Sequence, residues 1–176
     1  MSELERTRVR AREAPAENAY EALFQRIERF KERQQQGLVV IKPSDRQWEL
    51  NRQGRILWYL HPEQYKDTPL QDWYVFIHDI RTHSGKHRHQ GGLGIFVLEG
   101  EGYSTVNGER VDWEAGDLIL LPLLPEEVEH QHFNRNPGKP CRWLAFIHNG
   151  VFEAVATELT QTELSPEYQA GARAES

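Results

Sequence analysis

Four histidines of this chain stand in two pairs, and a single residue separates the members of each pair. His87 and His89 form the first pair, and His130 and His132 form the second. In a β-strand, side chains two residues apart point to the same side, so each pair would present two imidazole rings on one face. Imidazole is the commonest protein ligand for a transition metal. The spacing therefore predicts a metal centre between two strands.

The alternative is that these rings are buried structural residues, each satisfied by hydrogen bonds, as a lone histidine on an apolar strand often is. Two pairs with the same spacing, the second of them after the turn at Gly116 and Asp117, favour metal ligands over that alternative. Three imidazole ligands leave coordination positions open for substrate, water or oxygen. Such a centre suits catalysis.

The segments around the histidines predict short antiparallel strands. Alternating or apolar runs are followed by turn signals at Gly100-Glu101-Gly102, at Asn107-Gly108 and at Asn136-Pro137-Gly138. The expected strands are residues 38–41, 48–50, 55–60, 73–80, 93–98, 103–106, 110–113, 118–121, 128–133 and 141–148, together with a strand that begins after Gly85 and carries His87 and His89. Residues 61–72 are expected to form a rim loop, 151–159 a helix, and 165–176 a frayed end. The pattern indicates an all-β barrel.

Residues 73–150 resemble the cupin family of small jelly-roll β-barrels, which have two short motifs. The first has the form G-x5-H-x-H-x3-4-E-x6-G, and the second has the form G-x5-P-x-G-x2-H-x3-N. The positions that match are His87, His89 and Gly100 in the first motif, and Gly116, Pro122, His130 and Asn134 in the second. The resemblance implies a single cupin barrel, the double-stranded β-helix.

Three positions depart from the cupin motifs. Arg81 stands where the first motif has its leading glycine, Leu93 stands where it has a glutamate ligand, and Leu124 replaces a glycine of the second motif, with three extra residues before His130. Because leucine cannot bind a metal, the resemblance implies a centre of three neutral imidazoles, those of His87, His89 and His130. Three neutral ligands leave the ion's charge uncompensated, which favours an anionic, chelating substrate.

Among cupins, a His-x-His without the glutamate, followed by an apolar strand and Gly-Glu-Gly, is most similar to the gentisate dioxygenase group. Enzymes of that group cleave aromatic rings with ferrous iron on three histidines, and the first His of the final pair is the ligand. The resemblance thus implies that His130 binds the metal and that His132 supports it as a catalytic residue. Fe(II) is the expected metal, with Mn(II), Zn(II) and Ni(II) as alternatives. If the loop at residues 123–129 shifts the register, His132 becomes the third ligand.

Arg81 is the expected anchor for a substrate carboxylate, because a guanidinium group matches a carboxylate in a bidentate way. Arg88 and Arg142 are the other basic residues expected near the pocket, although Arg88 alternates outward from His87 and His89, which favours a surface position. The expected pocket residues are His78, Gln90, Leu93, Ile95 and Trp143. Packing or surface roles remain open for each of them.

These residues lead to the hypothesis of a mononuclear non-haem Fe(II) dioxygenase that uses O2 on a small aromatic or enolisable acid. One alternative is a metal-dependent isomerase, decarboxylase or lyase, in which the ion polarises a carbonyl group. The other is a cupin that binds a small ligand without turnover. Enzymes of the gentisate group usually carry two cupins, whereas this chain shows one.

Composition excludes several classes of protein. The formal net charge of −6 argues against nucleic-acid binding, and the sequence contains no apolar run long enough to span a membrane and no secretory signal pattern. A single cysteine, Cys141, excludes an internal disulfide and favours the cytoplasm. No charge pattern near Cys141 marks it as a nucleophile. The 38% hydrophobic content suits a folded domain.

The 176 residues divide into four expected parts. Residues 1–14 form a flexible basic arm, 15–37 an N-terminal helix, 38–160 the barrel with its core motifs at 85–134, and 161–176 a tail. Pro15 and Gly37 mark the ends of the helix. Its apolar stripe, which consists of Tyr20, Leu23, Phe24, Ile27 and Phe30, is expected to pack on the barrel or on a second subunit, so a homodimer is the expected assembly.

Overall fold

The computed structural model describes residues 18–174, and the chain divides between Gly37 and Leu38 into two units. In the first unit, helix α2 (Ala19–Gln36) begins where the Asn18 side chain accepts a hydrogen bond from the Tyr20 N–H, and it ends where Gly37 N–H donates to the Arg33 carbonyl. Residues 15–17 of the helix expected at 15–37 lie outside the described residues, as does the expected basic arm at 1–14.

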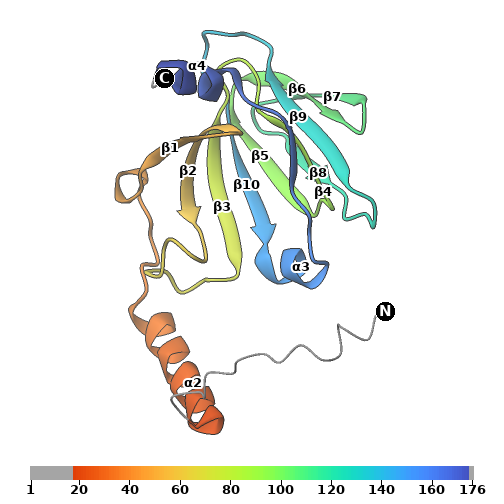
Figure 1. Ribbon diagram of the computed structural model, residues 1–176. Coiled ribbons are helices and arrows are strands. Elements are labelled where there is room, and N and C mark those ends of the chain that lie inside the picture. Colours follow the sequence, from red (N-terminus) through yellow and green to blue (C-terminus); the bar gives the residue numbers. More distant parts are fainter. Residues whose placement is uncertain (1–17, 175–176) are drawn as a thin grey trace, which may run out of the picture. The chain divides into compact units, whose positions relative to one another are not determined.

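The second unit consists of two antiparallel sheets (Figure 1). The first sheet has the order β1 (Trp48–Asn51), β2 (Gly54–Leu60), β3 (Trp73–Asp79), β10 (Arg142–His148), β5 (Leu93–Glu99) and β8 (Leu118–Leu121). The second has the order β11 (Thr160–Glu163), β4 (Lys86–His89), β9 (Val128–Asn134), β6 (Glu101–Val106) and β7 (Glu109–Glu114). The short helices are η1 (Pro43–Asp45), α3 (Asn149–Ala154) and α4 (Pro166–Ala174). This arrangement confirms the all-β jelly-roll prediction.

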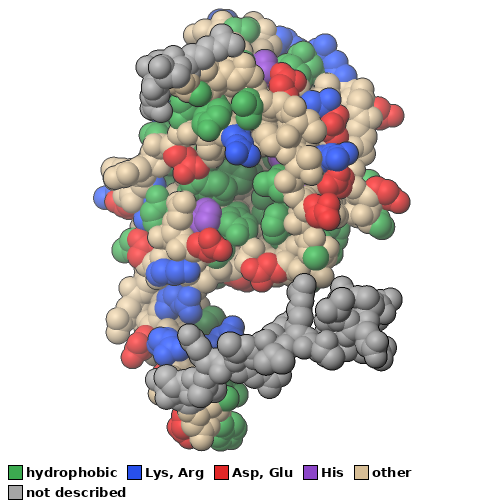
Figure 2. Space-filling model, viewed as in Figure 1, with side chains coloured by type: hydrophobic (Ala, Val, Ile, Leu, Met, Phe, Trp, Pro, Cys, Tyr) green, Lys and Arg blue, Asp and Glu red, His purple; other side chains and the backbone are tan. Residues whose placement is uncertain are grey.

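The core lies between the two sheets. Alternate residues of β5, Leu93, Ile95 and Val97, are at most 4% exposed and point inward, as the period of two predicts. Trp113 of β7 and Trp143 of β10 join them. On the face shown in Figure 2, hydrophobic side chains gather near the middle and charged side chains lie around them. The described part of the chain contains no helix long and apolar enough to cross a membrane.

Turn chemistry was predictable at the β6–β7 hairpin. Asn107 has a φ of 49° and Gly108 a φ of 85°, and positive φ at both central residues is what a type I′ turn requires. Asn107 tolerates this conformation better than most residues with a Cβ, and glycine adopts it freely. The hairpin therefore forms as expected from Asn-Gly.

Residues 38–41 do not form the expected strand. Val39 is 86% exposed and Val40 is 73% exposed. The Leu38 N–H finds a partner in the Asp67 carbonyl, which lies in a loop and not in a strand. β-branched residues favour a strand, but a strand also needs a neighbour with free backbone groups.

The C-terminal segment is more ordered than the expected tail at 161–176. Residues 160–163 form β11, which pairs with β4, and 166–174 form α4. The expected helix at 151–159 is shorter and lies earlier, as α3 at 149–154. The sequence Thr-Gln-Thr-Glu has no apolar alternation, so nothing in its composition indicated a strand. Backbone pairing with β4 and the Ser165 N–H bond to the Arg52 carbonyl hold this segment.

Candidate metal centre

Strand register brings three of the predicted histidines together. His87 of β4 lies directly opposite His130 of β9, and His89 follows two residues along β4 on the same side. The ring centroids of His87 and His130 are 4.2 Å apart, and those of His89 and His130 are 4.8 Å apart. One nitrogen from each ring lies within 4.8 Å of the other two. We call these residues the three-histidine cluster.

The cluster contains buried nitrogens that lack hydrogen-bond partners. Nδ1 of His87 and Nε2 of His130 are both orphaned. Nδ1 of His130 lies 3.1 Å from the Val128 carbonyl, so this nitrogen carries the proton and donates, which leaves a lone pair on Nε2. Buried polar atoms are almost always paired, so an orphaned lone pair beside two other imidazoles fits a metal ligand.

Burial keeps these rings neutral, the form that binds a metal. It lowers the pKa of His130 to about 3, with a further contribution from the neighbouring His89. The pKa of His87 falls well below its ordinary value because of burial and then because of the other imidazoles. Burial also lowers the pKa of His89.

His89 has a hydrogen bond that constrains its proton. The Gly91 N–H donates to Nδ1 of His89 at 3.0 Å, so a neutral His89 carries its own proton on Nε2. For Nε2 to become a metal ligand, the ring must release that proton or give up the Gly91 contact. Metal binding at the cluster is therefore coupled to a local change at His89.

His132 has the opposite tautomer to His130. Nδ1 of His132 lies 2.7 Å from Oγ of Ser104, which also accepts a hydrogen bond from Nε1 of Trp113 at 2.9 Å. No other described residue offers an acceptor to the Ser104 hydroxyl proton, so this hydroxyl donates to Nδ1, and Nε2 of His132 carries the ring proton. That Nε2 is buried and orphaned. His132 therefore presents a donor, whereas His130 presents a lone pair.

A small cavity of about 60 Å³ adjoins the cluster, which we call the histidine cavity. Its lining includes the predicted residues His78, Leu93 and Trp143, but the predicted residues Gln90 and Ile95 lie elsewhere. Oε1 of Gln90 accepts the Glu158 N–H, and Ile95 lies in the core. The full lining is Gln53, Ile56, Phe76, His78, His87, His89, Leu93, His130, His132, Trp143 and Ile147.

The lining residues that sequence reasoning missed come from two places. Ile56, Phe76 and Ile147 lie on strands that were predicted, and their inward alternation could have found them. Gln53 lies in the turn between β1 and β2, where sequence gives no signal. Burial lowers the pKa of His78 to about 3, so this ring is also neutral.

The structure does not bring Arg81 to the cavity. Arg81 is 60% exposed, and its guanidinium lies 3.5 Å from the buried carboxylate of Asp79. Arg142 lies at the same distance from Asp79, and Arg88 pairs with Glu127 at 2.7 Å. Strand β3 ends at Asp79, and Ile80 buries its side chain in the core, so Arg81 continues away from the histidines.

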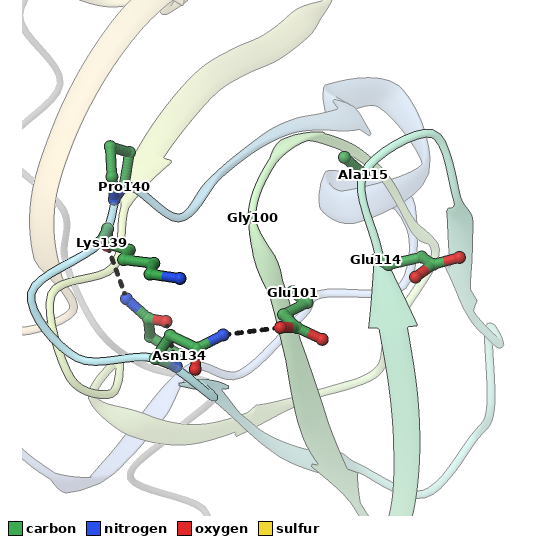
Figure 3. A pocket seen from close by; sticks show the side chains of 8 residues that line it. Gly100, Glu101, Glu114, Ala115, Asn134, Lys139 and Pro140 are labelled. Atoms are coloured by element: carbon green, nitrogen blue, oxygen red, sulfur yellow. Dashed lines mark hydrogen bonds between the residues drawn. The ribbon is translucent and has the colours of Figure 1, made fainter.

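A larger cavity, of about 460 Å³, lies at a different place (Figure 3). Asn134, which matches the second cupin motif, lines this cavity, and both its amide nitrogen and its amide oxygen form hydrogen bonds with the backbone. Its Nδ2 donates to the carbonyls of Ile80, Arg81 and Lys139, and its Oδ1 accepts the Asn136 N–H. None of the predicted metal ligands lines this cavity.

Cys141 is buried, and burial raises the pKa of its thiol to about 12, with a further contribution from the carboxylates of Asp79 and Glu99. A thiol with that pKa is protonated at neutral pH. It is therefore a core residue and not a nucleophile.

Comparison with known proteins agrees with this architecture. Residues 76–147 match the family model described as a cupin domain. A gentisate 1,2-dioxygenase from Streptomyces sp is 35% identical over 96 residues, which cover 49% of this chain and 25% of that enzyme. The match therefore spans about a quarter of the length of that relative.

Solved structures show the same fold. A mutant salicylate 1,2-dioxygenase from Pseudoaminobacter salicylatoxidans, in complex with gentisate, superposes with a TM-score of 0.50 and 21% identity, over 82% of this chain and 37% of that one. A variant of Streptomyces PAC13 with uridine superposes with a TM-score of 0.51 and 12% identity, over 75% of this chain and 96% of that one. At these identities the likeness shows the fold alone.

Proposed function

We propose that the chain, whose residues 76–147 match the cupin domain model, binds one divalent metal ion on His87, His89 and His130, and that with Fe(II) it is an oxygen-dependent dioxygenase. The observation that carries the proposal is the convergence of three imidazoles, two of which, those of His87 and His130, have a buried nitrogen with no hydrogen-bond partner. The identity to a gentisate dioxygenase supports the choice of reaction.

A divalent ion held by His87, His89 and His130 would supply a Lewis acid for a substrate with oxygen donors and, as Fe(II), the redox chemistry that a reaction with O2 needs. The chain supplies the surroundings. Leu93, Phe76 and Ile147 give the histidine cavity an apolar wall that excludes water. His132 also lines this cavity, and its Nε2–H has no partner among the described residues, so it is the candidate donor to a substrate oxygen.

The three neutral ligands also shape the choice of substrate. They add no negative charge, so an ion with two positive charges favours a ligand that loses a proton as it binds. An aromatic or enolisable compound with adjacent oxygens fits this requirement.

Metal analysis tests the proposal most directly. Protein prepared without added metal should contain about one equivalent, and His87→Ala and His130→Ala should each lose it. His61→Ala is the matched control, because His61 does not line the histidine cavity. Retention of the metal by His130→Ala would contradict the site.

Oxygen uptake tests the reaction. Protein loaded with Fe(II) under nitrogen should consume O2 when a chelating phenol or enol is added. Turnover with Zn(II) or Mn(II) under nitrogen would instead indicate an isomerase, decarboxylase or lyase.

A further inference from the structure

The histidine cavity is too small for the ligand that the proposed function requires. A water molecule needs about 15 Å³ of space measured in this way, so a cavity of about 60 Å³ holds about four groups of that size. An aromatic or enolisable acid with two oxygen donors is larger than this. In the cluster, His89 is 4% exposed and His130 is fully buried. A ligand of that size can therefore reach the cluster only if part of the protein moves.

Strand register shows at which end of the two sheets this movement can occur. Leu93 begins β5 and pairs with Ile147 near the end of β10, and both residues line the histidine cavity. Toward the opposite ends of the same strands, Val97 and Cys141 belong to the core and are fully buried. Because the core closes that side, a ligand must enter at the end where β10 leads into α3 (Figure 1).

The Phe152 side chain lies at this end, between the two sheets. Its ring centroid is 6.5 Å from that of His89, on β4 of the second sheet, and 6.3 Å from that of Tyr74, on β3 of the first sheet. Tyr74 pairs with Ile147 in the strand register, which places it at the same end as the cavity. Phe152 therefore bridges the gap between the sheets beside a proposed metal ligand.

Helix α3, which carries Phe152, is held less firmly than the strands around it. None of its residues, 149–154, is buried. At its start, Nε2 of His148 lies 3.3 Å from Oδ2 of Asp72, and the Asn149 N–H donates to the Asp72 carbonyl at 2.7 Å. A segment with few buried contacts can open while the rest of the protein stays folded.

The segment after α3 provides a second attachment and a point where the backbone can bend. Ala156 has a φ of 49°, a conformation that costs energy for a residue with a Cβ. The Glu158 N–H then donates at 3.0 Å to Oε1 of Gln90, the residue that follows His89. Opening of α3 relieves the strain at Ala156, while β11, which begins at Thr160, keeps its pairing with β4.

From the closed cavity, the position of Phe152 and the light attachment of α3, we propose that α3 is a lid over the histidine cavity and that Phe152 determines which ligands enter. In the closed lid, the Phe152 ring lies against His89 and Tyr74. Movement of α3 about His148 and Ala156 withdraws this ring and opens a path between the two sheets. The inference rests on the proposed metal function and adds how a ligand reaches the metal and which residue limits its size.

Two measurements on the metal-free protein test the lid without any ligand. Amide hydrogen exchange should show protection factors for Val155 and Thr157, whose acceptors lie in α3, at least about a hundredfold below those of β9 and β10. Diethyl pyrocarbonate should modify His89 about tenfold faster in Phe152→Ala than in the parent, and Val151→Ala on the same helix should change the rate by less than about twofold. Equal protection in α3 and β10, or an unchanged rate at His89 in folded Phe152→Ala, overturns the inference.

Entry of a ligand is measured with 4-nitrocatechol, an aromatic chelator whose absorbance changes when it binds a metal. In stopped-flow mixing with protein loaded with Co(II), it should associate about tenfold faster with Phe152→Ala than with the parent or with Val151→Ala. Phe152→Trp, which gives α3 a larger ring, should slow the association. Association rates of the parent and Phe152→Ala that agree within about twofold, in proteins that hold the metal, overturn the inference.

Asp72→Ala tests the attachment of α3 and leaves Phe152 in place. It removes the carboxylate beside His148, so it should raise both the amide exchange of α3 and the association rate of 4-nitrocatechol by about threefold. No change in these two rates overturns the role of this attachment. If Phe152→Ala does not fold, Asp72→Ala and the exchange rates of the parent still decide.

Metal content separates the two proposals. Protein that holds no metal defeats the proposed function, and the exchange and His89 measurements then decide the lid by themselves. Protein that holds the metal and admits 4-nitrocatechol equally fast with and without the Phe152 ring defeats the lid alone.

Discussion

Replacement of Ser104 by alanine tests the hydrogen-bond chain behind His132. Oγ of Ser104 joins the Trp113 indole N–H and Nδ1 of His132, and all three side chains are at most 3% exposed. Alanine leaves both nitrogens without a partner, and each such buried group costs about 1–3 kcal/mol. Two of them give about 2–6 kcal/mol. We expect the free energy of unfolding to fall by an amount in the lower part of this range, about 2–4 kcal/mol, because an alanine side chain is more favourably buried than a serine side chain.

Urea unfolding of the metal-free protein at pH 7.5 measures this loss, and ¹⁵N chemical shifts of the His132 ring report its tautomer. The parent should show the proton on Nε2, and Ser104→Ala should show a mixture or the proton on Nδ1. Thr105→Ala is the matched control on the same strand, because its side chain points to the opposite side; it should cost less than about 1 kcal/mol. A loss below 1 kcal/mol in Ser104→Ala, together with an unchanged tautomer, would refute the reasoning.

Three further predictions concern metal, pH and Arg81. A metal concentration one hundred times the dissociation constant should raise the free energy of unfolding of the parent by about 2.7 kcal/mol, and His130→Ala should show no rise in the same denaturation assay. Burial lowers the pKa of His78 and of His130 to about 3, so below pH 6.5 the unfolded chain binds protons that the folded chain does not. Stability should fall as the pH drops from 6.5 toward 3, by about 2.7 kcal/mol for each ring at pH 4.5, and His78→Gln should reduce the slope; equal stability at pH 7 and pH 5 would contradict this. Arg81→Ala should change the free energy of unfolding by less than about 1 kcal/mol and leave the metal content unchanged, because its pair with Asp79 is exposed on the arginine side.

The histidine pairs could be predicted because their signal is local. A separation of two residues places both rings of a pair on one face in any strand. The pairing of β4 with β9, which places His87 opposite His130, joins segments far apart in the sequence. The periodicity of either segment does not indicate which strand pairs with which. The similarity to the cupin motifs is what predicted that the two histidine pairs meet.

Tautomers could not be predicted from the sequence. His130 and His132 have the same spacing as His87 and His89, yet one ring presents a lone pair and the other a proton. The difference comes from the Val128 carbonyl in one case and from Ser104 in the other. Ser104 lies 28 residues away from His132 and faces it only because β6 pairs with β9.

Arg81 shows that the alternation of side chains does not continue past the end of a strand. Alternation along β3 would have carried it toward one face, but the strand ends at Asp79. The Ile80 N–H then bonds to the Cys141 carbonyl, and the Ile80 side chain enters the core. Beyond the last paired residue the period of two no longer applies, so the direction of Arg81 is set by this local packing.

The C-terminal strand β11 is what makes the metal strand an interior strand. β4 has four residues and pairs with β9 on one side, so without β11 its other edge would face solvent. β11 pairs with His87 and Arg88, and Gln161 donates to the Lys86 carbonyl and accepts from Gln53, which lines the histidine cavity. A short strand held on both sides keeps two ligands in fixed positions, as a metal centre requires. β11, whose sequence predicted neither a strand nor a functional residue, therefore helps to position the two histidines of β4.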